Sequence, residues 1–198
     1  MIILGITGSI GMGKSTATEM LREIGLPVLC SDKIVHKLLD PNGDGVKPVA
    51  ALYPAALDQR TGGINRKSLR GIIGYDHKQW DNLQAVLHPL VREEQRVFLE
   101  AEFHKGSKIA VLDIPLLFET QAQRRMNYTI CMTAKRKVQR ERVLARPHAS
   151  EEDFMFRMAR QMPDWKKRWK ANFVVRSDKG LDHTRAALEA IVKKITPR

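Results

Sequence analysis

The glycine-rich segment near the N-terminus constrains the fold more than any other part of the sequence. It follows the pattern Gly8-x-x-x-x-Gly13-Lys14-Ser15. Residues 1–6 before it are apolar and rich in isoleucine, as in a buried strand, and apolar residues recur at helical spacing after it. A strand, a glycine loop and a helix in this order predict a phosphate-binding loop of the Walker A type.

The residue types in this loop suit the binding of ATP and Mg²⁺. Glycines let backbone N–H groups converge on phosphate oxygens, and the positive end of the following helix points to the same place. Lys14 adds a cation for the β- and γ-phosphates, and Ser15 adds a hydroxyl ligand for Mg²⁺. A chance match has a probability on the order of one in a hundred. We expect the nucleotide to contact Ser9, Ile10, Gly11, Met12, Gly13, Lys14, Ser15 and Thr16.

Length and composition predict one globular domain. With 198 residues, of which 43% are hydrophobic and 28% charged, the chain can bury one core with a small inserted subdomain. No apolar run approaches the ~18 residues of a membrane span. The N-terminal apolar stretch has no basic leader, which favours a core strand over a signal peptide. We therefore expect a cytoplasmic protein. Cys30 and Cys131 end apolar runs, which favours buried core residues over a disulfide or a metal site.

The formal net charge of +12 favours polyanionic partners. Nucleic acid, an acidic membrane surface and phosphorylated small molecules all satisfy this condition. The densest basic runs, within residues 135–146 and 166–170, fall in predicted helices and not in a tail. Charge alone does not choose among these partners.

Further strands are predicted near residues 28, 109, 129 and 173, separated by helices. This alternation predicts an α/β fold with a five-stranded parallel sheet covered on both faces. Between residues 40 and 74, glycines and prolines punctuate short apolar segments, which predicts a helical, loop-connected insertion. Helical periodicity resumes at Leu83, and Pro89 predicts a kink or a new helix there.

Two acids follow predicted strands. Asp32 comes after the second strand, where ligands bind in open α/β sheets, although it could equally cap the next helix. Asp113 ends a buried strand, as in a Walker B motif whose carboxylate faces Mg²⁺ directly or through water. Further along, Thr133 is a candidate helix cap, and Ser150 with Asp153 resembles a capping box.

Several segments together resemble one enzyme family. They are residues 5–16, Ser31-Asp32-Lys33, His88-Pro89-Leu90-Val91-Arg92, Pro115-Leu116-Leu117-Phe118-Glu119, and Gln139-Arg140-Glu141-Arg142 with Arg146 and Arg160-Gln161. On these segments the chain resembles, from end to end, the dephospho-CoA kinases, which catalyse the last step of coenzyme A synthesis.

The resemblance implies transfer of the γ-phosphoryl group of ATP to the 3′-hydroxyl of the dephospho-CoA ribose. Asp32 would accept the hydroxyl proton, Lys14 would neutralise phosphate charge, and Arg140 would reach the transferring group. The other implied contacts are Ser15 and Asp113 with Mg²⁺, Arg146 with ATP, and His88, Arg92, Leu116 and Glu119 with the acceptor. On their own, His88 and Arg92 could equally belong to a solvated helix face.

The resemblance also implies an organisation for the chain. It is one P-loop NTPase domain with a core of residues 1–32 and 106–198, a helical CoA-binding insertion at about 33–105, and a lid at about 135–160. Two parts of the chain depart from the family pattern. Around the last predicted strand, Asn172 stands where Ala-Asp is usual and Ser177 stands where Asn is usual. Cys30 stands where Asp is frequent, which leaves Asp32 as the base candidate.

Three rival functions share some of these features. Another small-molecule kinase, for a nucleoside or nucleotide, would also need the phosphate loop and a lid. A nucleic-acid-binding ATPase would explain the charge, but no helix-turn-helix or RNP motif is present in the sequence. Binding of polyanions without turnover would indicate a non-enzymatic binding module. We expect small-molecule substrates and neither nucleic-acid nor membrane partners.

Overall fold

The computed structural model describes residues 1–147 and 149–196. It divides into two compact units. The first combines Met1–Leu29 with Ala101–Arg198, and the second is Cys30–Glu100. We describe each unit by itself.

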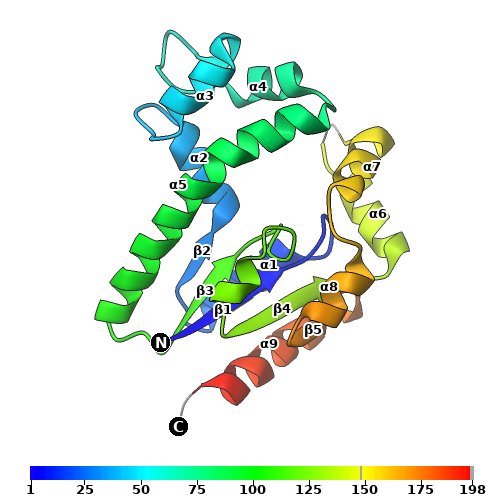
Figure 1. The fold of residues 1–198 in the computed structure, drawn as a ribbon. Coiled ribbons are helices and arrows are strands. Elements are labelled where there is room, and N and C mark those ends of the chain that lie inside the picture. The colour runs from blue at the N-terminus through cyan, green and yellow to red at the C-terminus, as the bar shows by residue number, and fades with distance from the viewer. Residues whose placement is uncertain (148, 197–198) are drawn as a thin grey trace. The chain divides into compact units, whose positions relative to one another are not determined.

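A five-stranded parallel sheet forms the centre of the first unit (Figure 1). The strands are β1 (Ile2–Thr7), β2 (Val28–Cys30), β3 (Ile109–Asp113), β4 (Tyr128–Thr133) and β5 (Phe173–Arg176), in the spatial order β2-β3-β1-β4-β5. In the parallel pairing of β1 with β3, Ile6 lies beside Asp113. Because the strands are parallel, the loop after β1 and the acid that ends β3 lie at the same edge of the sheet. The predicted α/β fold with a parallel sheet is confirmed.

Apolar side chains from alternate strand positions pack against two helices on one face. The helices are α1 (Lys14–Glu23) and α9 (Leu181–Ile195), and the shared core contains Leu4, Ile6, Ala17, Leu21, Val111, Ile130, Met132, Val175 and Leu188. On the other face, the segment between β3 and β4 lies close to the sheet. A Cβ atom at Gly5 would come within 2.6 Å of Leu117 Cδ1, so any larger residue would require the Leu117 side chain to move.

The remaining helices of the first unit are α6 (Arg136–Leu144), α7 (Glu151–Ala159) and α8 (Asp164–Lys170), with short 3₁₀ turns at Ala122–Arg125 and Ser177–Lys179. Ser150 Oγ accepts a hydrogen bond from Asp153 N at 3.0 Å, so that half of the predicted capping box is confirmed. The prediction for Thr133 is wrong. Its hydroxyl donates to Asp164 Oδ2 at 2.9 Å, and α6 begins only at Arg136 with no side-chain cap.

The second unit is helical and has its own core. It contains α2 (Ser31–Leu39), α3 (Val46–Leu52), a 3₁₀ turn at Pro54–Ala56, α4 (Arg66–Ile73) and most of α5 (His77–His104). The core is formed by Leu39, Val49, Tyr53, Ala56, Ile64, Leu69, Ile73, Leu83 and Leu87.

Side-chain caps explain where two helices of this unit begin. Asn65 Oδ1 accepts from Lys67 N and Ser68 N at the start of α4, and Asp76 does the same for the start of α5. The helix α5 continues through Pro89, so the expectation of a new helix there is wrong. Among the described residues, no helix combines the length and the apolar character needed to cross a membrane.

Candidate active site

The phosphate loop follows β1 and packs closely against its surroundings. Gly11 (φ 77°) and Gly13 (φ 80°) have left-handed backbone conformations that favour glycine. A Cβ atom at Gly11 would lie 2.8 Å from Gln139 O, and one at Gly13 would lie 2.8 Å from Ser177 Oγ. Conformation and space therefore both require glycine at these two positions.

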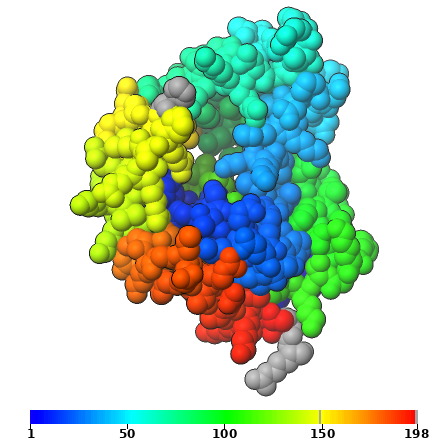
Figure 2. Space-filling view, turned by 180° about the vertical axis from the view of Figure 1, so that it is seen from behind, coloured from blue at the N-terminus to red at the C-terminus, as the bar shows by residue number. Residues whose placement is uncertain are grey.

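Two glutamines hold the loop at Ile10. Gln139 Nε2 of α6 donates to Ile10 O at 2.8 Å, and Ile10 N donates to Gln161 Oε1 at 3.1 Å. Gln139 is only 2% exposed. In the space-filling view, the yellow surface of α6 and α7 adjoins the blue surface of the N-terminal segment (Figure 2). The loop is therefore attached to the helices that carry the arginine-rich run.

Lys14 and Asp113 form an ion pair at the edge of the sheet. Lys14 Nζ lies 2.5 Å from Asp113 Oδ1, and both side chains are largely buried. Because α1 begins at Lys14, residues Ser15 and Thr16 lie in its exposed first turn, where backbone N–H groups lack intrahelical partners. The structure thus brings together the predicted phosphate-binding lysine and the predicted Walker B acid.

The residues at this edge have the chemistry to hold Mg²⁺. Hydroxyl and carboxylate oxygens, such as those of Ser15 and Asp113, are the hard ligands that Mg²⁺ prefers. Within residues 1–147 and 149–196, no group of three or more His, Cys, Asp or Glu side chains is placed to hold a metal. Mg²⁺ in kinases is bound by one or two protein groups together with water and substrate phosphates, so a two-residue set fits it.

The segment after β3 carries two further candidates, Leu116 and Glu119. Leu116 is half-buried, and its carbonyl oxygen accepts from Thr120. Glu119 Oε1 lies 2.9 Å from Lys167 Nζ and accepts from Met162 N at 2.7 Å. The Glu119 carboxylate is therefore engaged inside the protein.

The arginines of α6 and the following turn have different surroundings. Arg140 is exposed and makes a two-point ion pair with Glu151 of α7, with Nε–Oε1 at 3.1 Å and Nη2–Oε2 at 2.7 Å. This pairing raises the pKa of the Arg140 guanidinium. Arg146 is exposed and has no side-chain partner in the part of the chain that the structure describes. To contact the transferring phosphoryl group, as the family resemblance implies, Arg140 would first have to release Glu151.

The sequence analysis named Arg142 only as part of the arginine-rich segment and gave it no contact. Its guanidinium donates to Ser177 Oγ at 2.8 Å and to Ser177 O at 3.0 Å, and Ser177 in turn abuts Gly13. Arg142 lies three residues after Gln139 and therefore on the helix face that packs near the loop. Helical spacing from Gln139 is the signal that could have indicated Arg142.

In the second unit, Asp32 lies in the first turn of α2. The helix begins at Ser31 and has no side-chain cap, so the alternative that Asp32 is an N-cap is wrong. Ser31 Oγ accepts from Gln95 Nε2 at 3.1 Å, which attaches the start of α2 to α5. The Asp32 carboxylate is exposed and has no hydrogen-bond or ion-pair partner among the described residues.

His88 and Arg92 share one face of α5, since they are four residues apart, and Gln95 lies one turn further along it. Burial, aided by the charge of Arg92, lowers the pKa of His88. Arg92 is exposed and has no side-chain partner in the described part of the chain. The Ser31–Gln95 hydrogen bond therefore joins the start of α2 to the face that carries both predicted acceptor contacts.

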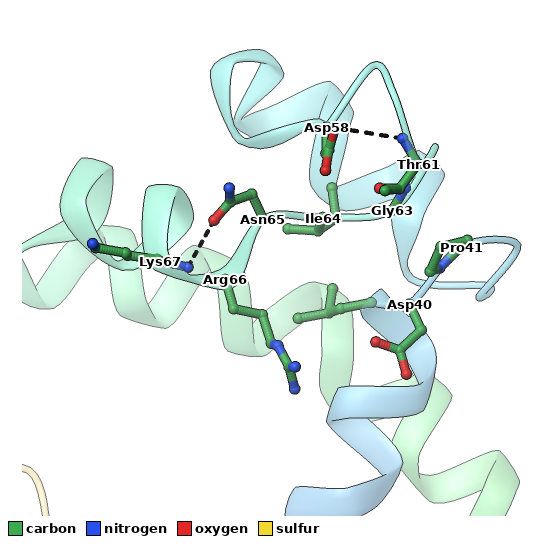
Figure 3. Close-up of a pocket in the computed structure, with 10 residues that line it drawn as sticks. Asp40, Pro41, Asp58, Thr61, Gly63, Ile64, Asn65, Arg66 and Lys67 are labelled. Carbon is green, nitrogen blue, oxygen red and sulfur yellow. Dashed lines mark hydrogen bonds between the residues drawn. The ribbon is translucent and has the colours of Figure 1, made fainter.

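The second unit also contains a cavity of about 460 Å³ between the end of α2 and the start of α4. Its lining mixes apolar residues such as Leu39, Pro41 and Ile64 with uncharged polar ones such as Thr61 and Asn65 and with the charged residues Asp40, Asp58, Arg66 and Lys67. Figure 3 shows the side chains of Asp40 and Arg66 projecting into the same open space. No sequence motif predicted this cavity.

Fold and site together define a P-loop kinase of the α/β class, with a Walker A lysine paired to the acid of the neighbouring strand. The chain belongs to the dephospho-CoA kinase family, since a family model described as dephospho-CoA kinase (CoaE) matches residues 2–183.

Individual relatives agree with this family. A dephospho-CoA kinase of Mesorhizobium japonicum is 42% identical over 195 residues, which cover 98% of this chain and 97% of the relative. The crystal structure of TT1252 from Thermus thermophilus is similar, with a TM-score of 0.81 and 33% identity over 99% of this chain and 98% of that one. A dephospho-CoA kinase structure from Campylobacter jejuni has the same fold, with a TM-score of 0.66 and 22% identity over 98% and 97% of the two chains.

Proposed function

We propose that this protein transfers the γ-phosphoryl group of ATP to the 3′-hydroxyl of the dephospho-CoA ribose and releases CoA and ADP. The observation that carries the proposal is the family match over residues 2–183, which includes a phosphate loop whose lysine pairs with Asp113. In phosphoryl transfer the protein contributes mainly positioning and electrostatic stabilisation.

The phosphate loop and the first turn of α1 would hold the ATP phosphates. Backbone N–H groups of the loop, together with Lys14, bind the phosphate oxygens. Ser15 and Asp113 would hold Mg²⁺, which neutralises charge on the β- and γ-phosphates when bound. Lys14 would exchange its contact with Asp113 for one with the nucleotide.

Asp32 would accept the proton of the ribose hydroxyl. Its carboxylate has no internal partner among the described residues, and the Ser31–Gln95 hydrogen bond fixes the helix turn that carries it. A base that needs to break no bond before it meets its substrate keeps the cost of reorganisation low. Arg92, which is also exposed, is the candidate contact for the diphosphate of the acceptor.

We assign the cavity of the second unit to the distal arm of the acceptor, which is an uncharged chain of amides and apolar groups. The apolar and uncharged polar part of the lining suits such a chain, and the volume of the cavity lies within the usual range for small-molecule sites. Filling it by Thr61→Trp should raise the KM for dephospho-CoA about tenfold or more and leave the KM for ATP unchanged.

Gln59→Trp is the matched control for this cavity, because Gln59 is exposed on the same loop and does not line the space. Equal KM values for dephospho-CoA in the two variants would place the arm elsewhere.

The function is tested by measuring ADP release and product mass with the purified protein, ATP and Mg²⁺. Dephospho-CoA should support turnover, whereas nucleoside monophosphates, DNA and RNA should not. Lys14→Ala is the control against a contaminating kinase, since it should abolish turnover while the protein keeps its circular dichroism spectrum. Faster turnover with a nucleoside monophosphate would favour a different small-molecule kinase, and stimulation by DNA or RNA would favour a nucleic-acid-dependent ATPase.

A further inference from the structure

The connection between α7 and α8 contacts the phosphate loop and the segment after β3 with consecutive residues. Gln161 Oε1 accepts from Ile10 N in the phosphate loop at 3.1 Å. The next residue, Met162, donates its backbone N–H to Glu119 Oε1 at 2.7 Å. One short connection therefore joins the loop after β1 to the segment after β3.

A buried lysine completes this link. Lys167 of α8 is 0% exposed, and its Nζ lies 2.9 Å from Glu119 Oε1 and 3.0 Å from Pro115 O. Thr7 Oγ1 donates to the same carbonyl oxygen at 3.0 Å. Pro115 comes two residues after Asp113, so these contacts fix the chain just beyond the carboxylate that pairs with Lys14.

The contacts of Glu119 are internal. Its Oε1 atom serves both Met162 and Lys167, and its Oε2 atom is buried without a hydrogen-bond partner among the described residues. A buried ion pair generally stabilises a fold no better than an apolar pair of similar volume. Stability alone therefore does not account for a fully buried lysine at this place.

We propose that Glu119, Lys167 and Gln161 are positioning residues that form a brace behind the phosphate site. The brace holds Asp113 in place relative to the phosphate loop, and Glu119 does not contact the acceptor. This inference rests on the proposed function in so far as Asp113 and Lys14 handle Mg²⁺ and ATP. A misplacement of about 1 Å at a reacting centre can cost roughly 100-fold in rate, which is the size of effect that the brace would prevent.

The test compares Lys167→Met with the double variant Glu119→Gln/Lys167→Met. The single variant leaves a buried carboxylate unpaired and should lower the melting temperature strongly. The double variant removes that charge, while Gln can still accept from Met162 N, so the melting temperature should recover. Lys170→Met is the control, because Lys170 is an exposed lysine of the same helix.

In the stable double variant, kcat should stay about 100-fold below that of the wild type, while the KM for dephospho-CoA changes less than about twofold. The Mg²⁺ concentration needed for half-maximal turnover should rise. Recovery of kcat together with stability would overturn the proposal, because the pair would then be only structural. A raised KM for dephospho-CoA at unchanged kcat would also overturn it and return Glu119 to the acceptor site.

Equilibrium binding of ATP separates this proposal from the proposed function. If the wild type does not turn over dephospho-CoA, the proposed function fails, but the brace still predicts that the double variant loses the gain in ATP affinity that Mg²⁺ provides. An unchanged gain would overturn the brace whatever the acceptor is.

Discussion

Single polar residues of the site differ in whether the fold already engages them. Asp113 and Glu119 have internal cationic partners, Lys14 and Lys167. Asp32 has no side-chain partner in residues 1–147 and 149–196. A side chain without an internal partner can bind a substrate without first breaking an ion pair, whereas an engaged one such as Lys14 must first exchange its partner.

Asp32→Asn tests the proposed base. The change keeps the size of the side chain but removes the ability to accept a proton, so kcat should fall by roughly 10²–10⁴-fold. The KM values for both substrates and the melting temperature should change little, since Asp32 neither caps α2 nor pairs with another described residue. Steady-state kinetics with dephospho-CoA check this, and turnover close to that of the wild type would remove Asp32 from the mechanism.

The lowered pKa of His88 predicts that the folded protein loses stability in acid. Burial lowers the pKa of His88 in the folded protein, so the unfolded chain binds the proton more tightly. The contribution of His88 to the free energy of unfolding is complete above its unfolded pKa of about 6.5 and is lost as the pH falls through the folded value.

His88→Gln should therefore reduce the difference in melting temperature between pH 7.5 and pH 5.5. Gln84→Ala, one turn earlier on α5, changes packing without removing a titrating group and should leave that difference as it is. An equal pH dependence in the wild type and in His88→Gln would contradict the prediction.

At the scale of elements, α6 presents its faces to different neighbours. Gln139 and Val143 are buried against the phosphate loop, where a Cβ atom at Gly11 would meet both residues. Arg140 projects instead toward α7 and pairs with Glu151. The helix therefore anchors the loop with one face and offers an exposed arginine from another.

This arrangement predicts unequal effects among the arginines of α6. Arg140→Lys should lower kcat roughly 100-fold, because a lysine cannot reproduce the bidentate contact with a phosphoryl group. Arg136→Lys, at an exposed position of the same helix, should change kcat less than about twofold. Glu151→Gln should keep activity, since it only releases Arg140. Equal losses in Arg140→Lys and Glu151→Gln would mean that Arg140 serves the ion pair and not catalysis.

At the scale of the whole molecule, two cores and a strong positive charge stand out. The sheet and the helical unit each have their own apolar cluster. The formal net charge of +12 attracts both proposed substrates, since both are anions. Long-range attraction of this kind is screened by salt, because the Debye length falls to about 10 Å at 0.1 M ionic strength.

Raising potassium chloride should therefore lower kcat/KM for dephospho-CoA several-fold while kcat changes little. Sucrose at matched osmolality is the control, since it does not screen charge. A parallel fall in kcat and in kcat/KM would indicate that salt acts on the folded site and not on the encounter.

The sequence by itself determined the parallel α/β sheet, the phosphate loop and the acid that ends β3. These features depend on residues that are close in sequence, because apolar periodicity and glycine spacing set local backbone conformation. The strand register then places Asp113 beside Ile6, at the edge where Lys14 begins its helix.

Only the tertiary structure decided which side chains meet. Gln161 binds Ile10 from 151 positions away, and Lys167 reaches Pro115 across 52 positions. No local pattern encodes such pairs, since they depend on how separate elements pack. For the same reason the sequence placed Thr133 at a helix cap, whereas the structure pairs it with Asp164, and no sequence pattern indicated that Glu119 pairs with Lys167.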